Sequence, residues 1–209
     1  MTQRVDVNHY AAGWSEDQHP PGSRPEPAPS LRYLDQFFRL RCAADLHALN
    51  LFPNAKEVTE SFAAFCALRR WPGVTEFGKR WHCIVVADGH TPRTGALIAC
   101  LTRWRVTSID PEMKVTPRWE KVQRLRTIRA NVQDVPACEL PAGEDGTAVV
   151  AVHGHAPNWS MRALWSRLPE PRVYIALPCC RDQRLEREPT AEYADWNVHS
   201  PKRDVLVYA

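Results

Sequence analysis

Apolar residues follow two different patterns along the chain. Between residues 31 and 70 they recur at helical spacing, whereas after residue 80 they form short continuous runs. The first pattern predicts one helix over about residues 31–49, with Ser30 as its N-cap. It predicts a second helix over 55–70, which Asn54 opens and which ends before Pro72. We therefore expect a helical segment ahead of the rest of the chain.

The short apolar runs are typical of strands that are buried on both faces. They are His82–Ala87, Arg105–Ile109, Leu125–Ile128, Thr147–Val152 and Arg172–Leu177, and helices are expected at Ala96–Leu101 and Ser160–Leu168. Strands that alternate with helices indicate an α/β fold with a mostly parallel sheet and crossover connections. Two further segments, Tyr193–Val198 and Lys202–Tyr208, predict a closing pair of strands.

The composition divides the chain into three parts. Residues 1–30 are rich in proline and poor in aliphatic side chains, so we expect a flexible or extended arm. Residues 31–78 form the helical extension and residues 79–209 the α/β domain. Two interpretations of the extension stay open. It covers one side of the sheet, or it forms a substrate-binding cap whose basic groups are Arg39, Arg41, Lys56, Arg69 and Arg70.

Charge, cysteine content and apolar run lengths limit the class of protein. The net charge of +3 permits nucleic-acid binding without requiring it. Seven cysteines, an odd number without a CxxC pair, favour a reducing compartment over a disulfide framework. No apolar run approaches the roughly 18 residues of a membrane span, and the first residues do not resemble a secretory signal. We expect a soluble, cytoplasmic protein without a membrane partner.

Polar residues follow the first two predicted strands. Asp88 and Gly89 begin a turn that contains Pro92 and Gly95, and Asp110 ends the second strand. In parallel sheets, ligands bind outside the carboxyl ends of the strands, where loop amides and a helix N-terminus can hold a polar group. A carboxylate about twenty residues after the first loop is well placed to bind a ribose diol. Alternatively, Asp88 caps the following helix and Asp110 is a turn residue.

Histidines and cysteines follow the later strands. His153 and His155 follow the fourth, and Cys179 and Cys180 follow the fifth. The histidines are candidates for a base or for substrate contacts, or are rim residues bonded to backbone. These residue types can bind zinc, but adjacent cysteines fit one tetrahedral ion poorly, so we expect no metal and inert thiols.

Several of these segments resemble one family. Residues 83–209 are similar to class I methyltransferases that use S-adenosylmethionine. Val85–Gly95 resembles the first, cofactor-binding motif, Ser108–Pro111 the second, and Val150–His155 lies where the fourth motif sits. Ile175–Cys180 resembles the cysteine-ended strand of some RNA-modifying members, and Asn197–Val207 is similar to their terminal hairpin.

The resemblance implies a Rossmann-like, mostly parallel sheet with a C-terminal antiparallel hairpin, preceded by the helical segment. It implies that S-adenosylmethionine binds at Asp88, Gly89, Pro92, Gly95 and Asp110, and that His153 and His155 face the reacting methyl group. RNA is the acceptor that the resemblance favours. A nicotinamide enzyme is disfavoured because GxGxxG is missing after the first strand.

A second hypothesis stays open beside the enzyme. The first loop contains only two glycines, fewer than this motif usually has. The chain would then be a catalytically inactive methyltransferase-fold protein that serves as a structural or RNA- or protein-binding part of a larger assembly. In that hypothesis, residues 1–30 contact the partner protein or RNA.

Overall fold

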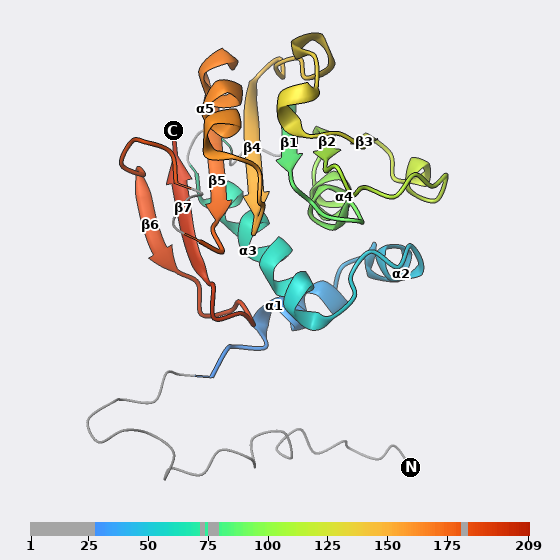
Figure 1. Cartoon of the computed structure of the whole chain (residues 1–209). Helices are drawn as coiled ribbons and strands as arrows, with labels where there is room; N and C mark the ends of the chain where they lie inside the picture. Colours follow the sequence, from blue (N-terminus) through green and yellow to red (C-terminus); the bar gives the residue numbers. More distant parts are fainter. Residues whose placement is uncertain (1–27, 72–73, 75–79, 181–183) are drawn as a thin grey trace, which may run out of the picture.

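Seven strands of the described residues form one twisted sheet with the order β3-β2-β1-β4-β5-β7-β6 (Figure 1). The structure is a computed structural model that describes residues 28–71, 74, 80–180 and 184–209. Strands β1 to β5 are parallel, and β7 is antiparallel to both β5 and β6. The strands are β1 Trp81–Val86, β2 Arg105–Ile109, β3 Leu125–Ile128, β4 Gly146–Val152, β5 Arg172–Leu177, β6 Ala191–Ala194 and β7 Asp204–Tyr208. The predicted Rossmann-like fold class is confirmed.

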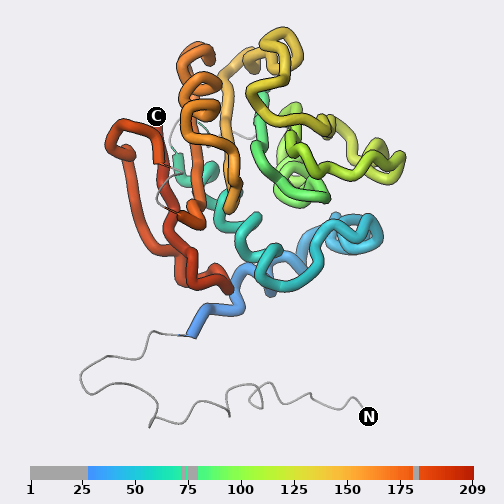
Figure 2. The backbone as a smooth tube through the Cα atoms, in the orientation of Figure 1, coloured from blue at the N-terminus to red at the C-terminus, as the bar shows by residue number. Residues whose placement is uncertain are grey.

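Helices cover both faces of this sheet (Figure 2). They are α1 Arg32–Phe38, α2 Ala43–Ala48, α3 Ala55–Arg70, α4 Arg93–Leu101 and α5 Asn158–Arg167, with short 3-10 turns η3 Trp119–Lys121, η4 Val132–Asp134 and η5 Ala137–Glu139. Alternate β1 side chains enter two cores. Cys83 and Val85 pack with α3 and α4, whereas Ile84 and Val86 pack with α5. Burial on both faces explains the continuous apolar run.

The first predicted helix, over residues 31–49, is two helices in the structure. Phe37 and Leu46 are both buried in the same core. Nine residues correspond to about two and a half turns, so one straight helix would place these side chains on opposite faces. The break between α1 and α2 buries both. Ser30 is also not the N-cap, which is Leu31, although Ser30 Oγ accepts a hydrogen bond from Arg32 N at 3.1 Å.

Other boundaries agree more closely with the sequence. Helix α3 begins after Asn54, whose side chain accepts a hydrogen bond from Glu57 N at 3.1 Å, as predicted. Helix α4 begins at Arg93, three residues before the predicted start at Ala96. The closing strand pair is present, but β6 lies at Ala191–Ala194 rather than at 193–198.

The helical extension and the sheet share one core. Phe62 and Leu68 of α3 belong to the same cluster as Val150 and Ile175 of the sheet. Helix α3 thus covers one face of the sheet, as the first interpretation of the extension predicts. The proposed arm lies almost entirely in residues 1–27, outside the described residues. No helix in the described part of the chain is long and apolar enough to cross a membrane.

Candidate functional site

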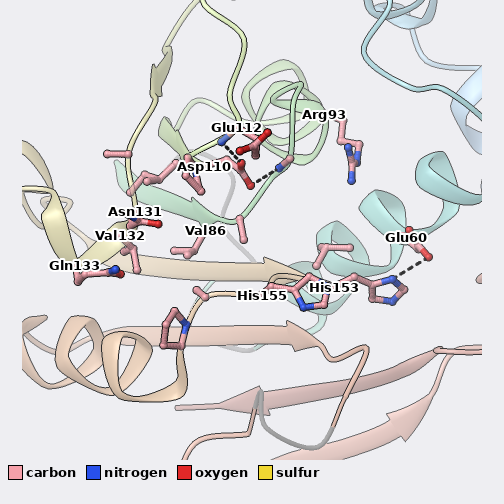
Figure 3. A pocket seen from close by; sticks show the side chains of 18 of the residues that line it. Glu60, Val86, Arg93, Asp110, Glu112, Asn131, Val132, Gln133, His153 and His155 are labelled. Atoms are coloured by element: carbon pink, nitrogen blue, oxygen red, sulfur yellow. Dashed lines mark hydrogen bonds and ion pairs between the residues drawn. The ribbon is translucent and has the colours of Figure 1, made fainter.

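A cavity of about 370 Å³ lies at the carboxyl ends of the central strands (Figure 3). The residues that end β1, β2 and β4 line it, together with the segment after β3 and the first turns of α3. Its polar and charged lining residues are Lys56, Glu57, Glu60, Arg93, Asp110, Glu112, Asn131, Gln133, His153 and His155. The sequence predicts a small-molecule site at this edge of the sheet, and this cavity lies there.

Asp110 is the buried residue that follows β2 and lines this cavity. Its Oδ2 accepts a hydrogen bond from Gly89 N at 2.8 Å, and its Oδ1 accepts one from Glu112 N at 2.7 Å. A carboxylate has about four acceptor positions, so roughly two remain for the hydroxyl groups of a ligand. Gly89 has φ +83, a left-handed conformation that favours glycine.

Asp88 faces helix α4 instead of the cavity. Its two oxygens accept hydrogen bonds from Thr94 N and Gly95 N, each at 3.0 Å, and from Ser108 Oγ at 2.8 Å. Burial raises the pKa of this carboxyl, while the hydrogen bonds and the nearby Arg93 oppose the shift. Asp88 therefore satisfies the first N–H groups of α4, which explains why the helix begins early.

Gly95 and Pro92 are also outside the cavity lining. Pro92 is the N-cap residue of α4. A Cβ on Gly95 would lie 2.0 Å from Ser108 Oγ, so the helix lies too close to β2 for any side chain there. The structure brings Gly89, Asp110, His153 and His155 together in the lining of the cavity. The lining does not include Asp88, Pro92 or Gly95.

Two strand ends at the cavity have unusual backbone conformations. Ala87 after β1 has φ 57 and His153 after β4 has φ 48. Both are held by backbone hydrogen bonds, from Ala87 N to Ile109 O at 2.7 Å and from His153 N to Leu177 O at 2.8 Å. Non-glycine residues with positive φ carry strain of about 1–3 kcal/mol and cluster at functional sites.

His153 is fixed on both sides of its ring. Nδ1 lies 3.3 Å from Oε1 of Glu60 (Figure 3). Nε2 lies 3.0 Å from the carbonyl oxygen of Lys202. A carbonyl only accepts, so Nε2 donates in its hydrogen bond, and Nδ1 faces the carboxyl group of Glu60. Glu60 is 1% exposed and also contacts Lys56 Nζ at 3.2 Å. Both ring nitrogens are therefore engaged within the protein, and the pair holds the His153 ring in one orientation at the cavity.

A second ion pair joins α3 to α4 beside this one. Arg93 Nε lies 2.8 Å from Oε2 of Glu57, and Lys56 Nζ lies 3.5 Å from Oε1 of the same carboxylate. The sequence analysis missed Glu57 and Glu60 as site residues. Glu60 lies among the buried positions Val58–Phe62, and a carboxylate in a buried run is the signal that could have found it.

The remaining rim residues lie at the ends of β4 and β5. His155 is exposed, and its Nε2 lies 3.7 Å from the Sγ of Cys179. Within the described parts of the chain, no group of three or more His, Cys, Asp or Glu side chains is arranged to hold a metal ion. The rim thus offers hydrogen-bonding and acid–base groups.

Comparisons with known proteins find matches among solved structures only. No protein-family description matches the chain, and no curated protein is detectably similar in sequence. Among solved structures, MtNAS in complex with MTA and tNA is similar over 85% of this chain and 69% of its own, with a TM-score of 0.48 and 13% identity. Burkholderia thailandensis 1,6-didemethyltoxoflavin-N1-methyltransferase, bound to its substrate and S-adenosylhomocysteine, is similar over 88% and 75%, with a TM-score of 0.42 and 13% identity.

Proposed function

We propose that this chain is an S-adenosylmethionine-dependent methyltransferase whose cofactor lies across the ends of β1, β2 and β4. The observation that carries the proposal is the convergence of Gly89, Asp110, His153 and His155 on one cavity. These residues come from three of the segments that resemble methyltransferase motifs. The sheet around them has the strand arrangement that the resemblance implies.

The lining of the cavity fits this cofactor in size and chemistry. Its volume of about 370 Å³ is within the range of about 300–1,000 Å³ typical of small-molecule sites. Asp110 retains acceptor positions for ribose hydroxyls, and Ile109 and Val132 offer apolar contacts for adenine. Arg93 and Glu57 at the other side offer opposite charges for the carboxylate and ammonium groups of the methionine part.

The bound cofactor supplies an electrophilic methyl group. The chain's own residues would bind and orient the two reactants, which is the main contribution expected for such a transfer. Because Glu60 and Lys202 fix the ring of His153, it can hold an acceptor in one orientation. The exposed imidazole of His155, which also lines the cavity, is the group that can accept a proton that the acceptor loses.

Titration calorimetry with S-adenosylhomocysteine tests the proposal. We expect saturable micromolar binding that Asp110→Ala weakens at least about tenfold, because a hydrogen bond to a charged group contributes about 1.5–3 kcal/mol. Glu120→Ala removes an exposed charge away from the cavity and should leave binding unchanged. If the intact chain does not bind, the enzyme proposal is wrong, and the inactive methyltransferase-fold hypothesis takes its place.

An RNA acceptor is the finer part of the proposal. The resemblance to RNA-modifying members supports it, and the net charge of +3 is compatible with it. Incubation of the protein and labelled cofactor with total RNA should label the RNA. If label enters only small molecules or proteins, the RNA part is contradicted while the methyltransferase part stands.

A further inference from the structure

A hollow lined mainly by apolar side chains lies between α1, α2 and the start of α3. Its volume is about 260 Å³, and its lining includes Leu34, Phe37, Phe38, Leu46, Phe52 and Val58. It shares no described lining residue with the candidate site. We call this separate place on the molecule the α1–α2 hollow.

The lining of the α1–α2 hollow offers few polar or charged groups. None of its described lining residues is Asp, Glu, Lys or Arg. The side chain of Asn54 is already bound, because it accepts a hydrogen bond from Glu57 N at 3.1 Å as the N-cap of α3. A hollow of this composition suits an apolar group better than a polar or ionic one.

Three phenylalanine rings contribute to the hollow. The ring centroids of Phe37 and Phe52 are 5.5 Å apart at an interplanar angle of 77°, and those of Phe37 and Phe38 are 5.8 Å apart at 76°. Phe37 is buried, whereas Phe38 is exposed at the rim. Aromatic rings attract one another at centroid distances of about 4.5–7 Å, so a further aromatic ring would find suitable partners here.

Phe38 also belongs to a second apolar stripe of α1. Tyr33 and Phe37 are buried in the core. Leu31, Leu34 and Phe38 recur at positions i, i+3 and i+7, which is the spacing of one helix face. Leu31 is 59% exposed and Phe38 is 76% exposed, so no segment within the described parts of the chain covers the ends of this stripe. Large exposed apolar side chains beside an apolar hollow are typical of an interaction site.

The chain enters the described part of the structure close to this hollow. Residues 1–27 precede that part. Ser30 N donates a hydrogen bond to the carbonyl oxygen of Trp196 at 3.0 Å, which fixes the chain just before α1. Leu34, in the lining of the hollow, is four residues further along, which corresponds to at most about 14 Å of chain. The preceding segment therefore joins the molecule near the hollow.

Residues 1–27 contain an aromatic side chain at a suitable separation. Their two aromatic residues are Tyr10 and Trp14, and the proline-rich residues 19–29 follow. Ala28 lies 14 positions after Trp14. This spacer reaches about 43 Å in the polyproline conformation and about 20 Å as a random coil, so Trp14 can reach the hollow in either case. A short tether also raises the effective concentration of Trp14 to about millimolar.

We propose that Trp14 of the same chain binds in the α1–α2 hollow. Burial of the indole ring against the phenylalanine rings removes apolar surface of both partners from water. The volume of about 260 Å³ is below the range of about 300–1,000 Å³ for a whole drug-sized ligand and suits one large side chain. The prolines of the spacer have few conformations to lose, which lowers the entropic cost of binding.

Photochemical crosslinking of the full-length chain tests this proposal. Trp14 is replaced by the photoreactive aromatic amino acid p-benzoylphenylalanine, and mass spectrometry of proteolytic peptides maps the product. We expect a crosslink within one chain to residues 34–58. The same amino acid at Gln18, four positions later in the same segment, is the matched control. It should give little of this product, because Trp14 then occupies the hollow.

Two alanine variants of the crosslinking chain test whether the hollow holds the ring. Phe38→Ala removes a side chain from the rim and should lower the yield of the intramolecular product several-fold. Val115→Ala removes a side chain that is 84% exposed and outside the hollow, and it should leave the yield unchanged. Because both positions are exposed, we expect both variants to fold, and thermal unfolding checks this. The mapping in the chain with Phe38 intact needs neither variant.

Several outcomes would overturn the proposal. A product of twice the mass of the chain would show that the segment binds a second copy. Crosslinks that map away from residues 34–58, or the absence of any crosslink, would show that the hollow does not hold the ring. Equal yields in Phe38→Ala and Val115→Ala would show the same. None of these results depends on cofactor binding, so a failure here and a failure of the methyltransferase proposal are separate results.

Discussion

The carboxylate of Asp110 and the backbone amide of Gly89 form a 2.8 Å hydrogen bond that joins the end of β2 to the loop after β1. The two segments that resemble the first and second cofactor motifs are thus held together by the protein itself. A hydrogen bond within the protein restricts the motion of both segments, which lowers the entropy that must be lost when a ligand binds.

Gly89 and Ala87 should respond in opposite directions to substitution. Gly89→Ala places a side chain at φ +83, with its Cβ 2.9 Å from Arg93 Nη1, and should lower the free energy of unfolding by about 1–2 kcal/mol. Ala87→Gly relieves a residue at φ 57 and should be neutral or slightly stabilising. Urea unfolding measures both, and equal losses would contradict the assigned backbone conformations.

Gly95 should tolerate no side chain because α4 lies against β2. Gly95→Ala should destabilise the protein by about 1–3 kcal/mol, since its Cβ would lie 2.0 Å from Ser108 Oγ. Combining it with Ser108→Ala removes that oxygen and should restore part of the loss. A double variant whose loss equals the sum of the two single losses would contradict this close contact.

The Asp88–Gly95 loop shows what the sequence could and could not predict. The sequence predicts the position of this loop, because the strand before it is buried on both faces and is therefore apolar at successive positions. The sequence does not show which polar residue faces a ligand, because Asp88 can either bind a ligand or cap α4. In the structure Asp88 accepts two hydrogen bonds from the start of α4 and one from Ser108 of β2, and it is not among the lining residues of the cavity.

Stability should fall at acid pH through His82. Burial lowers the pKa of this imidazole below its ordinary value of 6.5, and Nε2 lies 2.9 Å from Thr107 Oγ1. The unfolded chain therefore takes up the proton at a higher pH than the folded chain does. The contribution of the neutral His82 ring to stability is fully present above the ordinary pKa of 6.5 and is lost as the pH falls through the lower pKa of the folded state.

The measurement is urea unfolding of the intact chain and of His82→Gln between about pH 7.5 and about pH 5.5. The intact chain should lose more stability over this interval than the variant does. His47→Gln, at an exposed position on α2, is the matched control and should keep the pH dependence of the intact chain. If the stability of His82→Gln depends on pH as strongly as that of the intact chain, His82 is not the cause of the loss at acid pH.

Glu60 and His153 should be energetically coupled. Glu60→Gln leaves His153 without a charged partner and leaves Lys56 with Glu57 alone, and it should destabilise the protein by about 1–2 kcal/mol because both partners can still reach water. In a double-mutant cycle with His153→Gln, the coupling should be about 1 kcal/mol. Additive losses in chemical unfolding would show that the 3.3 Å contact has no energetic weight.

The pair of Glu60 and His153 was the part of the site that the sequence predicts least. His153 was a candidate because it ends a predicted strand, but its partner Glu60 lies 93 positions earlier on a helix. Helical periodicity predicts that Glu60 lies in a buried stretch of its helix, but it does not predict which strand end Glu60 contacts. The strain at Ala87 and His153 is also invisible in the sequence, because only the packed ends of β1 and β4 impose it.

A crystal structure of the protein with bound S-adenosylhomocysteine would show where the cofactor lies. We expect the ligand in the cavity of about 370 Å³, with ribose hydroxyls within hydrogen-bond distance of the Asp110 carboxylate and its sulfur toward His153. A ligand bound elsewhere, such as in the larger hollow of about 550 Å³ beside Cys100 and Arg124, would contradict it.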